Sequence, residues 1–211
     1  WLFRERLKEN GMLEFIWEEF VNQLKAKGYD VKKGVIQDAT FITSDPGHAK
    51  SDVPRGGEAK TRRSKDGAWA KKGNKSHFGY KGHIKTDVEN NFIWKVETTA
   101  ANVHDSQVDL ANEGEVRYGD KGYHGAKTKG YDASMKRASR GHQLSVFDEL
   151  RNKRISSKRS LVERCFSVIK IVFKSGHVMV TTVERAAIKM AFNAIGYNLF
   201  NLLGIVNRKA A

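Results

Sequence analysis

The sequence predicts an α/β fold in which a mixed sheet is flanked by helices. In the middle of the chain, residues 77–87 and 92–98 alternate between apolar and polar side chains on either side of a turn, which predicts an antiparallel hairpin. Near both ends of the chain, apolar residues recur at three- and four-residue steps, which predicts helices. Strands and helices combined in this way are typical of a sheet with helices on its faces.

Local patterns place the individual elements. The helical period within 1–27 is expected to break at Gly11 and to stop at Gly28. The first strand of the hairpin has one apolar and one polar face, which predicts a half-buried strand. The remaining expected elements are a strand over 35–43, a short helix capped by Asp105, strands over 115–119 and 131–137, and helices over 158–173 and from Thr182 to about 205.

Three segments follow from these elements. Residues 1–30 form a helical lead-in, expected to be the end of an upstream region. Residues 31–180 form the central domain, and 181–211 form a C-terminal helix packed on it. Residues 45–75 contain both prolines, five glycines and many basic residues without periodicity, which predicts a long basic insertion on the surface.

The composition favours a polyanionic partner. Lys and Arg number 38 against 24 Asp and Glu, so the formal net charge is +14. Such an excess favours nucleic acid, because bound phosphates release condensed counterions. The alternative is that many of these lysines only solvate the surface.

Cysteine content and hydropathy indicate the cellular compartment and exclude several kinds of site and segment. Cys165 is the only cysteine, which excludes an internal disulfide framework and a multi-cysteine zinc site and favours a cytoplasmic location. The first residues mix charged and apolar side chains, so no signal peptide is expected, and Trp1 indicates a longer parent chain. Residues 186–206 contain a lysine and three asparagines, which favours an amphipathic helix over a membrane span.

Three acidic residues stand out by position. Asp38 lies within a predicted strand and Asp120 at the end of another, where a charge is costly unless it is paired, solvated or bound to metal. Arg159, Glu163 and Lys170 fall within about 40° of one another on a predicted helix. Three carboxylates suit two cations such as Mg²⁺ in phosphoryl transfer. Taken alone, Asp38 also fits a buried, hydrogen-bonded aspartate. The charged residues of the helix taken alone also fit a solvated face with ion pairs.

At these positions the sequence resembles the DDE transposases of bacterial insertion sequences, in the group of families numbered four and five. The resemblance runs from about Leu2 to Leu203. It is carried by Gln-Asp-Ala-Thr around Asp38, by Gly-Asp-Lys-Gly-Tyr-His-Gly over 119–125, by Arg159 with Glu163 and Lys170, and by Asn-Val-His-Asp over 102–105 and Arg-Ile-Ser-Ser over 154–157. Ser156 departs from the family pattern, which often has a tyrosine three residues before the arginine.

The resemblance implies a ribonuclease-H-like catalytic domain with Asp38, Asp120 and Glu163 as catalytic residues. These would bind Mg²⁺, with Mn²⁺ able to substitute, cut DNA at transposon ends and direct the 3′-hydroxyl at a target strand. Double-stranded DNA is the implied partner, with a homodimer assembled on it near the nucleoid and no membrane. Residues 1–30 are then expected to be the end of an upstream DNA-binding region. The alternative is a transposase-derived DNA-binding protein or fragment that is catalytically inactive.

Further residues are candidates for contacting DNA. The resemblance assigns phosphate contacts to Arg159 and Lys170. Near the predicted site or in the basic segments we add Lys121, Tyr123, His124, Trp69, Lys75 and Lys81. Trp69 would stack on an unpaired base, and either Trp69 or Tyr123 would replace the missing tyrosine. The other clamp candidates in the insertion are Lys60, Arg62, Arg63, Lys65, Lys71 and Lys72. The glycines at 119, 122 and 125 lack the Gly-Lys-Ser/Thr of a phosphate loop, and the seven histidines show no zinc-ligand spacing.

Overall fold

The computed structural model describes residues 2–47 and 64–210. Clamp candidates Lys60, Arg62 and Arg63 lie outside these residues. The helices are α1 (Leu2–Glu9), α2 (Met12–Ala26), α3 (Val146–Ser167) and α4 (Val183–Ala210), with 3₁₀ turns η1 (Asp105–Gln107) and η2 (Lys121–Tyr123) and a π-helical turn η3 (Val168–Val172). The strands are β1 (Val35–Ser44), β2 (Ala68–Lys72), β3 (Lys75–Asp87), β4 (Ile93–Ala100), β5 (Val116–Tyr118), β6 (Tyr131–Asp132) and β7 (His177–Val178).

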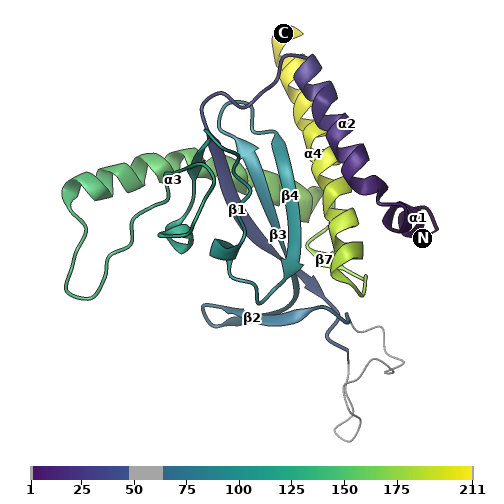
Figure 1. Ribbon diagram of the computed structural model, residues 1–211, viewed down its shortest axis with the longest axis horizontal. Helices are drawn as coiled ribbons and strands as arrows, with labels where there is room; N and C mark the ends of the chain where they lie inside the picture. The colour runs from purple at the N-terminus through teal and green to yellow at the C-terminus, as the bar shows by residue number, and fades with distance from the viewer. Residues whose placement is uncertain (1, 48–63, 211) are drawn as a thin grey trace, which may run out of the picture.

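The strands form one mixed sheet with β1 at its centre. β1 pairs with β3 in antiparallel orientation and with β5 in parallel orientation, which gives the order β4–β3–β1–β5–β6. The predicted hairpin is confirmed as β3–β4, and its connection contains Asn91 at a φ of 57°. The sheet is open and flanked by helices (Figure 1), as in the ribonuclease-H-like fold, so the predicted fold class is confirmed.

The main core lies between the sheet and the helices α3 and α4. Ile36 and Ile42 of β1 and Tyr80 and Ile84 of β3 point to this face, and they pack against a helical layer. That layer contributes Val162, Cys165, Ile169, Ala186, Met190, Ala194 and Tyr197. Because Asp38 has the same strand parity as Ile36 and Ile42, its side chain lies on this helix-covered face too.

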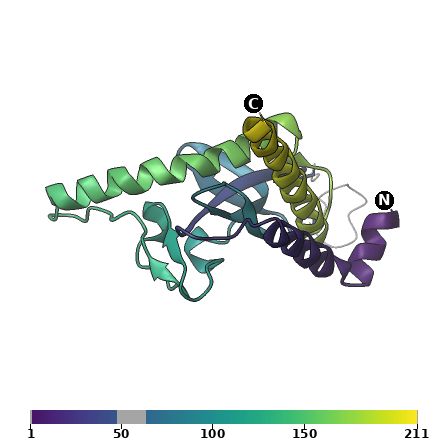
Figure 2. The ribbon, with the colours of Figure 1, turned by 90° about the horizontal axis from the view of Figure 1, so that it is seen from above.

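The N-terminal helices belong to the same helical layer. α2 lies alongside α4 in both views (Figures 1 and 2), and a second core joins Leu24 of α2 to Phe92, Trp94 and Ile205. The break predicted at Gly11 is confirmed by a left-handed φ of 60° between α1 and α2. None of the helices in the described part of the chain has the length and apolar content that a membrane crossing requires.

The expectation that the first hairpin strand is half-buried is wrong. β3 is buried from Phe78 through Asp87, including the polar face that carries Lys81, His83 and Lys85. The segment after β4 covers that face, since Asp105 binds Lys81 at 2.8 Å and Glu115 binds Lys85 at 3.0 Å. Polar side chains are tolerated in this layer because both lysines find a partner of opposite charge and Nε2 of His83 lies 2.9 Å from the Thr99 hydroxyl.

Helix α3 begins much earlier than the predicted residue 158. Its first residue is Val146, and the Ser145 hydroxyl caps it by accepting from the Asp148 amide at 3.1 Å. The amino-terminal half of α3 extends away from the sheet in both views (Figures 1 and 2). The helix ends in the π-helical turn η3, which contains Lys170. The face that we predicted for Lys170 from an ideal α-helix is therefore shifted.

Three smaller predictions are corrected. The predicted insertion over 45–75 is not structureless throughout, since β2 pairs with β3 around the turn at Gly73. Asp105 is not the cap of the short helix, because the His104 side chain accepts from the Ser106 amide instead. The strand expected over 131–137 is only the two residues of β6. The Thr182 cap of α4 is confirmed by a 3.3 Å bond from the Arg185 amide.

Candidate active site

The two predicted catalytic aspartates lie at neighbouring parallel strands, with Asp38 within β1 and Asp120 two residues after the end of β5. The last pair in the β1–β5 ladder joins Ile36 to Tyr118, so Asp38 and Asp120 each lie two residues beyond it. Successive residues in a strand alternate between faces, so both aspartates continue on the face of that pair. The negative charge of Asp120 contributes to raising the pKa of the Asp38 carboxyl, as expected for two acids at one site.

Asp38 is paired with an arginine from α3. Its Oδ2 accepts from Nη2 of Arg159 at 2.8 Å, while its Oδ1 accepts from the amide of Ala39 at 2.8 Å. Burial raises the pKa of Asp38 and outweighs the opposing effect of the Arg159 guanidinium. The arginine thus supplies positive charge to a carboxylate that would be costly to bury alone.

Asp120 is held by its own turn. Its Oδ1 accepts from the amide of Gly122 at 2.8 Å and caps the 3₁₀ turn η2. Its side chain is not paired with a cation among the described residues. Gly122 leaves room for this contact, because a Cβ there would lie 2.9 Å from the same Asp120 oxygen.

Glu163 is the member of the predicted trio that does not join the aspartates. It lies on α3, one turn after Arg159, and is exposed. Among the residues that the structure describes, no three His, Cys, Asp or Glu side chains form a group that could hold a metal ion. The structure therefore brings together Asp38, Asp120 and Arg159, with Glu163 on the same helix as the arginine.

Tyr123 lies behind the two aspartates and is fully buried. Burial raises the pKa of its hydroxyl, and the charges of Asp38, Asp105 and Asp120 raise that pKa further. Among the described residues this hydroxyl makes no hydrogen bond of good geometry, although the Gln37 side chain lies close enough to lower its pKa. The carboxylates of Asp38 and Asp120 are hard oxygen donors, which is the chemistry that Mg²⁺ prefers.

A basic pocket adjoins Asp38 along β1. This cavity of about 290 Å³ is lined by Ala39, Thr40, Phe41, Thr43, Lys72, His77, Lys170 and Gly176. Burial and the nearby Lys72 lower the pKa of Lys170. The His77 ring stacks on Phe41 with centroids 4.7 Å apart. No carboxylate among the described residues lines this pocket, so within that part of the chain its two ammonium groups have no counter-ion.

Comparison with known proteins decides the family. Residues 29–199 match the family model described as the transposase DDE domain. The chain belongs to this family of transposases. It is also 26% identical over 229 residues to the transposase for insertion sequence element IS1106 of Neisseria meningitidis serogroup B, covering 99% of this chain and 78% of that protein. No solved structure matches the chain.

The other residues that we predicted to contact DNA differ in their solvent exposure. Lys121, His124, Lys75 and Trp69 are exposed, and the Trp69 ring packs at a tilt against Phe78. Lys81 is buried and donates to Asp105 and to the carbonyl of Val103. These contacts leave Lys81 and the buried Tyr123 less accessible to a ligand than the exposed residues.

Sequence reasoning missed the way in which β2 contributes to the pocket beside Asp38. Lys72 and His77 flank the β2–β3 turn, and pairing of these strands places both beside Lys170. Gly73-Asn74 between two short alternating runs was the local signal for this hairpin. The basic composition around it predicted a surface loop and masked that signal.

Proposed function

We propose that this transposase cuts DNA at transposon ends in a metal-dependent reaction and transfers the resulting 3′-hydroxyl to target DNA. The observation that supports this most is the pairing of β1 with β5, because Asp38 and Asp120 each follow its last pair, Ile36 with Tyr118, by two residues. Carboxylates held by a central strand and by a capped turn just after the neighbouring strand keep a fixed arrangement, as phosphoryl transfer requires.

In this proposal Asp38 and Asp120 hold Mg²⁺, and Mn²⁺ can substitute. The bound ions would stabilise charge on the attacking and leaving oxygens of the phosphodiester. The protein's own contribution is to hold two unprotonated carboxylates at one place. Arg159 favours that state for Asp38, since its guanidinium opposes the rise in the pKa of Asp38 that burial causes.

Glu163 completes the site when DNA is bound. A DNA phosphate competes with Asp38 for Arg159, and release of the 2.8 Å pair frees α3 to adjust by a small shift. Glu163 follows Arg159 by four residues, so both side chains project from nearly the same helix face. We expect this adjustment to bring Glu163 toward the aspartates within a homodimer assembled on the two transposon ends.

The pocket beside Asp38 binds a DNA phosphate. Lys170 is half-buried next to Lys72, and this arrangement of like charges is unfavourable without an anion. A phosphate supplies two or more acceptor oxygens to the ammonium groups and to the Thr40 hydroxyl. Because Thr40 follows Asp38 by two residues on β1, a phosphate here fixes the strand next to the reacting group.

Cleavage of DNA carrying the element's ends tests the proposal. Asp38→Asn, Asp120→Asn and Glu163→Gln should each reduce Mg²⁺-dependent cleavage by at least about 10³-fold while DNA binding persists. Glu149→Gln makes the same change at an exposed position of α3 and should cleave normally. Full cleavage by Asp120→Asn would refute the assignment. Specific DNA binding without cleavage by the unmodified chain would identify a DNA-binding protein that has lost catalysis.

A further inference from the structure

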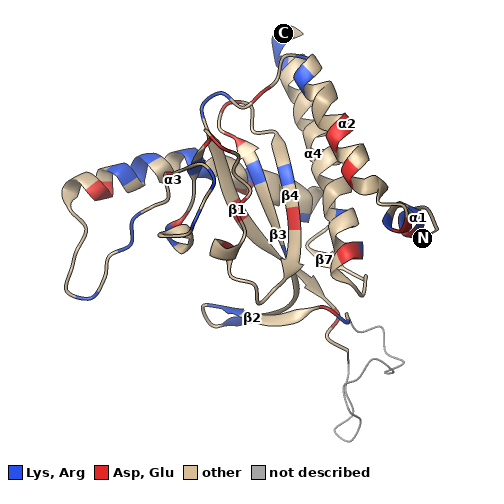
Figure 3. Ribbon diagram, in the orientation of Figure 1, with Lys and Arg blue, Asp and Glu red and all other residues tan. Residues whose placement is uncertain are grey.

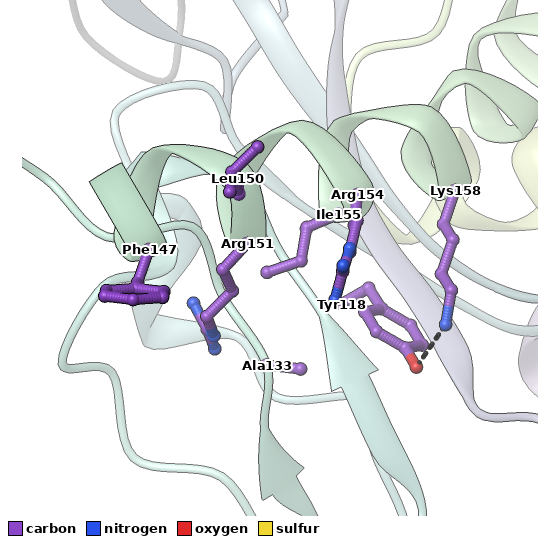
Figure 4. Close-up of a pocket in the computed structure, with 8 residues that line it drawn as sticks. All are labelled: Tyr118, Ala133, Phe147, Leu150, Arg151, Arg154, Ile155 and Lys158. Carbon is purple, nitrogen blue, oxygen red and sulfur yellow. Dashed lines mark hydrogen bonds between the residues drawn. The ribbon is translucent and has the colours of Figure 1, made fainter. Parts of the chain in front are cut away.

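A second cavity lies where α3 leaves the body of the molecule. It has a volume of about 270 Å³ and is lined by Tyr118, Ala133, Phe147, Leu150, Arg151, Arg154, Ile155 and Lys158 (Figure 4). Its walls are apolar, formed by two aromatic rings, two branched aliphatic side chains and an alanine. Phe147 and Leu150 are exposed, with 84% and 50% of their surface accessible. Large exposed apolar side chains grouped around a hollow indicate a binding site.

The rim of this cavity carries positive charge and no negative charge. Three of its eight lining residues are basic, and none is acidic. Figure 3 shows Lys and Arg recurring along this part of α3. Arg151 donates to the carbonyl of Ser134 at 2.8 Å, whereas Arg154 has no hydrogen bond or ion pair among the described residues. At least one guanidinium is therefore available for an anion.

One wall already holds a cation against an aromatic ring. Nζ of Lys158 donates to the Tyr118 hydroxyl at 2.7 Å and lies 4.2 Å from the centre of its ring. This contact fixes the ring of Tyr118 as a rigid, flat surface. Phe147 offers a second ring near the opposite end of the cavity, as Figure 4 shows.

From these features we propose that the cavity binds one unpaired nucleotide of the DNA on which the transposase acts. A nucleobase has flat apolar faces that stack on aromatic rings and arginine planes, and it carries a phosphate at its edge. An isolated phosphate would need no apolar floor, and a neutral apolar peptide would need no basic rim. The combination of the two fits a nucleotide.

Two lining residues of the cavity are close in sequence to residues of the candidate active site. Tyr118 ends β5, two residues before Asp120, and Lys158 is the residue before Arg159 on α3. A nucleotide held here would therefore anchor DNA within a short distance of the two aspartates. The inference depends on the proposed function only in taking DNA as the ligand, because binding in this cavity requires neither metal nor cleavage.

Binding of bulged DNA without metal tests this inference. Two duplexes of one sequence are compared in EDTA at low salt, one fully paired and one with a single unpaired 2-aminopurine. We expect the protein to bind the bulged duplex about tenfold more tightly and to quench the 2-aminopurine emission by stacking. Because no metal is present, this result is independent of whether the chain cleaves DNA.

Matched variants assign the effect to the cavity. Phe147→Ala removes an exposed ring and should abolish the preference and the quenching, while paired duplex binds within about twofold of the unmodified protein. Arg154→Gln should weaken binding of both duplexes and flatten their salt dependence. Phe15→Ala, which removes an exposed ring on α2 outside the cavity, should keep the preference, and Trp69→Ala tests the alternative stacking residue. Circular dichroism confirms that each variant is folded.

Three results would overturn the inference. Equal affinity of the unmodified protein for both duplexes would exclude a nucleotide site. A preference that survives in Phe147→Ala, or that disappears only in Trp69→Ala, would place the unpaired base elsewhere. Phe147-dependent binding of an acidic amphipathic peptide, without any preference for the bulge, would identify the cavity as a protein-binding groove.

Discussion

Oδ2 of Asp38 accepts a hydrogen bond from Nη2 of Arg159 at 2.8 Å, across 121 residues of sequence. This contact joins the central strand β1 to α3, so the helix that carries Glu163 is tied directly to the aspartate pair. Both side chains are less than one-fifth exposed, which places the ion pair out of bulk water. Because this ion pair lies in the candidate active site, a change in the charge of Asp38 or Arg159 should also change the stability of the fold.

Breaking this pair from one side should destabilise the protein. Arg159→Gln leaves the Asp38 carboxylate buried without its cation, and we expect unfolding in urea at pH 7 to show a loss of about 2 kcal/mol. The double variant Asp38→Asn with Arg159→Gln should recover part of that loss, because no charge then remains unpaired. Arg164→Gln, exposed on the same helix, is the control and should change stability by less than about 0.5 kcal/mol. Strictly additive effects of the two single changes would show that the pair is not coupled.

Removing one of the two neighbouring negative charges should have the opposite effect. In Asp120→Asn the amide oxygen can still accept from Gly122, while the charge that raises the pKa of Asp38 disappears. We expect this variant to melt about 3 °C above the unmodified protein in EDTA. Millimolar Mg²⁺ should raise the melting temperature of the unmodified protein, since binding to the folded state stabilises it, but not that of the variant. If Mg²⁺ stabilises both equally, the ion is held elsewhere.

The strand positions of both aspartates could be predicted from the sequence, whereas their partners could not. Runs of β-branched and alternating residues placed Asp38 within a strand, which β1 confirms, and Asp120 at the end of a strand over 115–119, whereas β5 ends two residues before Asp120. The pairing of Asp38 with Arg159 depends on how α3 packs on the sheet. That packing is a tertiary contact without a signal in local sequence.

The missed elements have physical reasons of their own. The first half of α3 has no apolar stripe because it lies outside the core, with Val146, Phe147 and Leu150 all exposed. Its helical period was therefore invisible, although the Ser145 cap with Asp148 three residues later was a readable start signal. The polar face of β3 was expected to be solvated, because alternation alone does not reveal that residues 101–115 will cover it.

The two lysines beside Asp38 should lower the stability of the fold and raise its affinity for DNA. Lys170→Gln removes a half-buried charge that is destabilised by burial and by Lys72, so we expect a small gain in stability, up to about 1 kcal/mol. The same change should weaken DNA binding and reduce the slope of log K against log salt by about 0.9, the value for one phosphate contact on duplex DNA. Lys72→Gln should reduce the slope similarly. Lys95→Gln, exposed on β4, is the control, and an equal change of slope in it would show that the pocket has no special role.

His83 should make the fold sensitive to mild acid. Burial lowers its pKa from 6.5 to about 4. The charge of Asp105 raises this pKa and that of Lys81 lowers it, both with smaller effects. Because the folded state favours the neutral ring, the stabilising effect of His83 is present above pH 6.5 and is lost as the pH falls toward 4. The free energy of unfolding should decrease by about 3 kcal/mol over this range on account of His83.

His83→Gln preserves a donor and an acceptor for Thr99, which lies 2.9 Å from Nε2, and should remove that part of the pH dependence. The measurement is urea unfolding between pH 4 and 7, with the exposed His142→Gln as control. Identical pH profiles for the unmodified protein and His83→Gln would show that the imidazole can be protonated in place without cost.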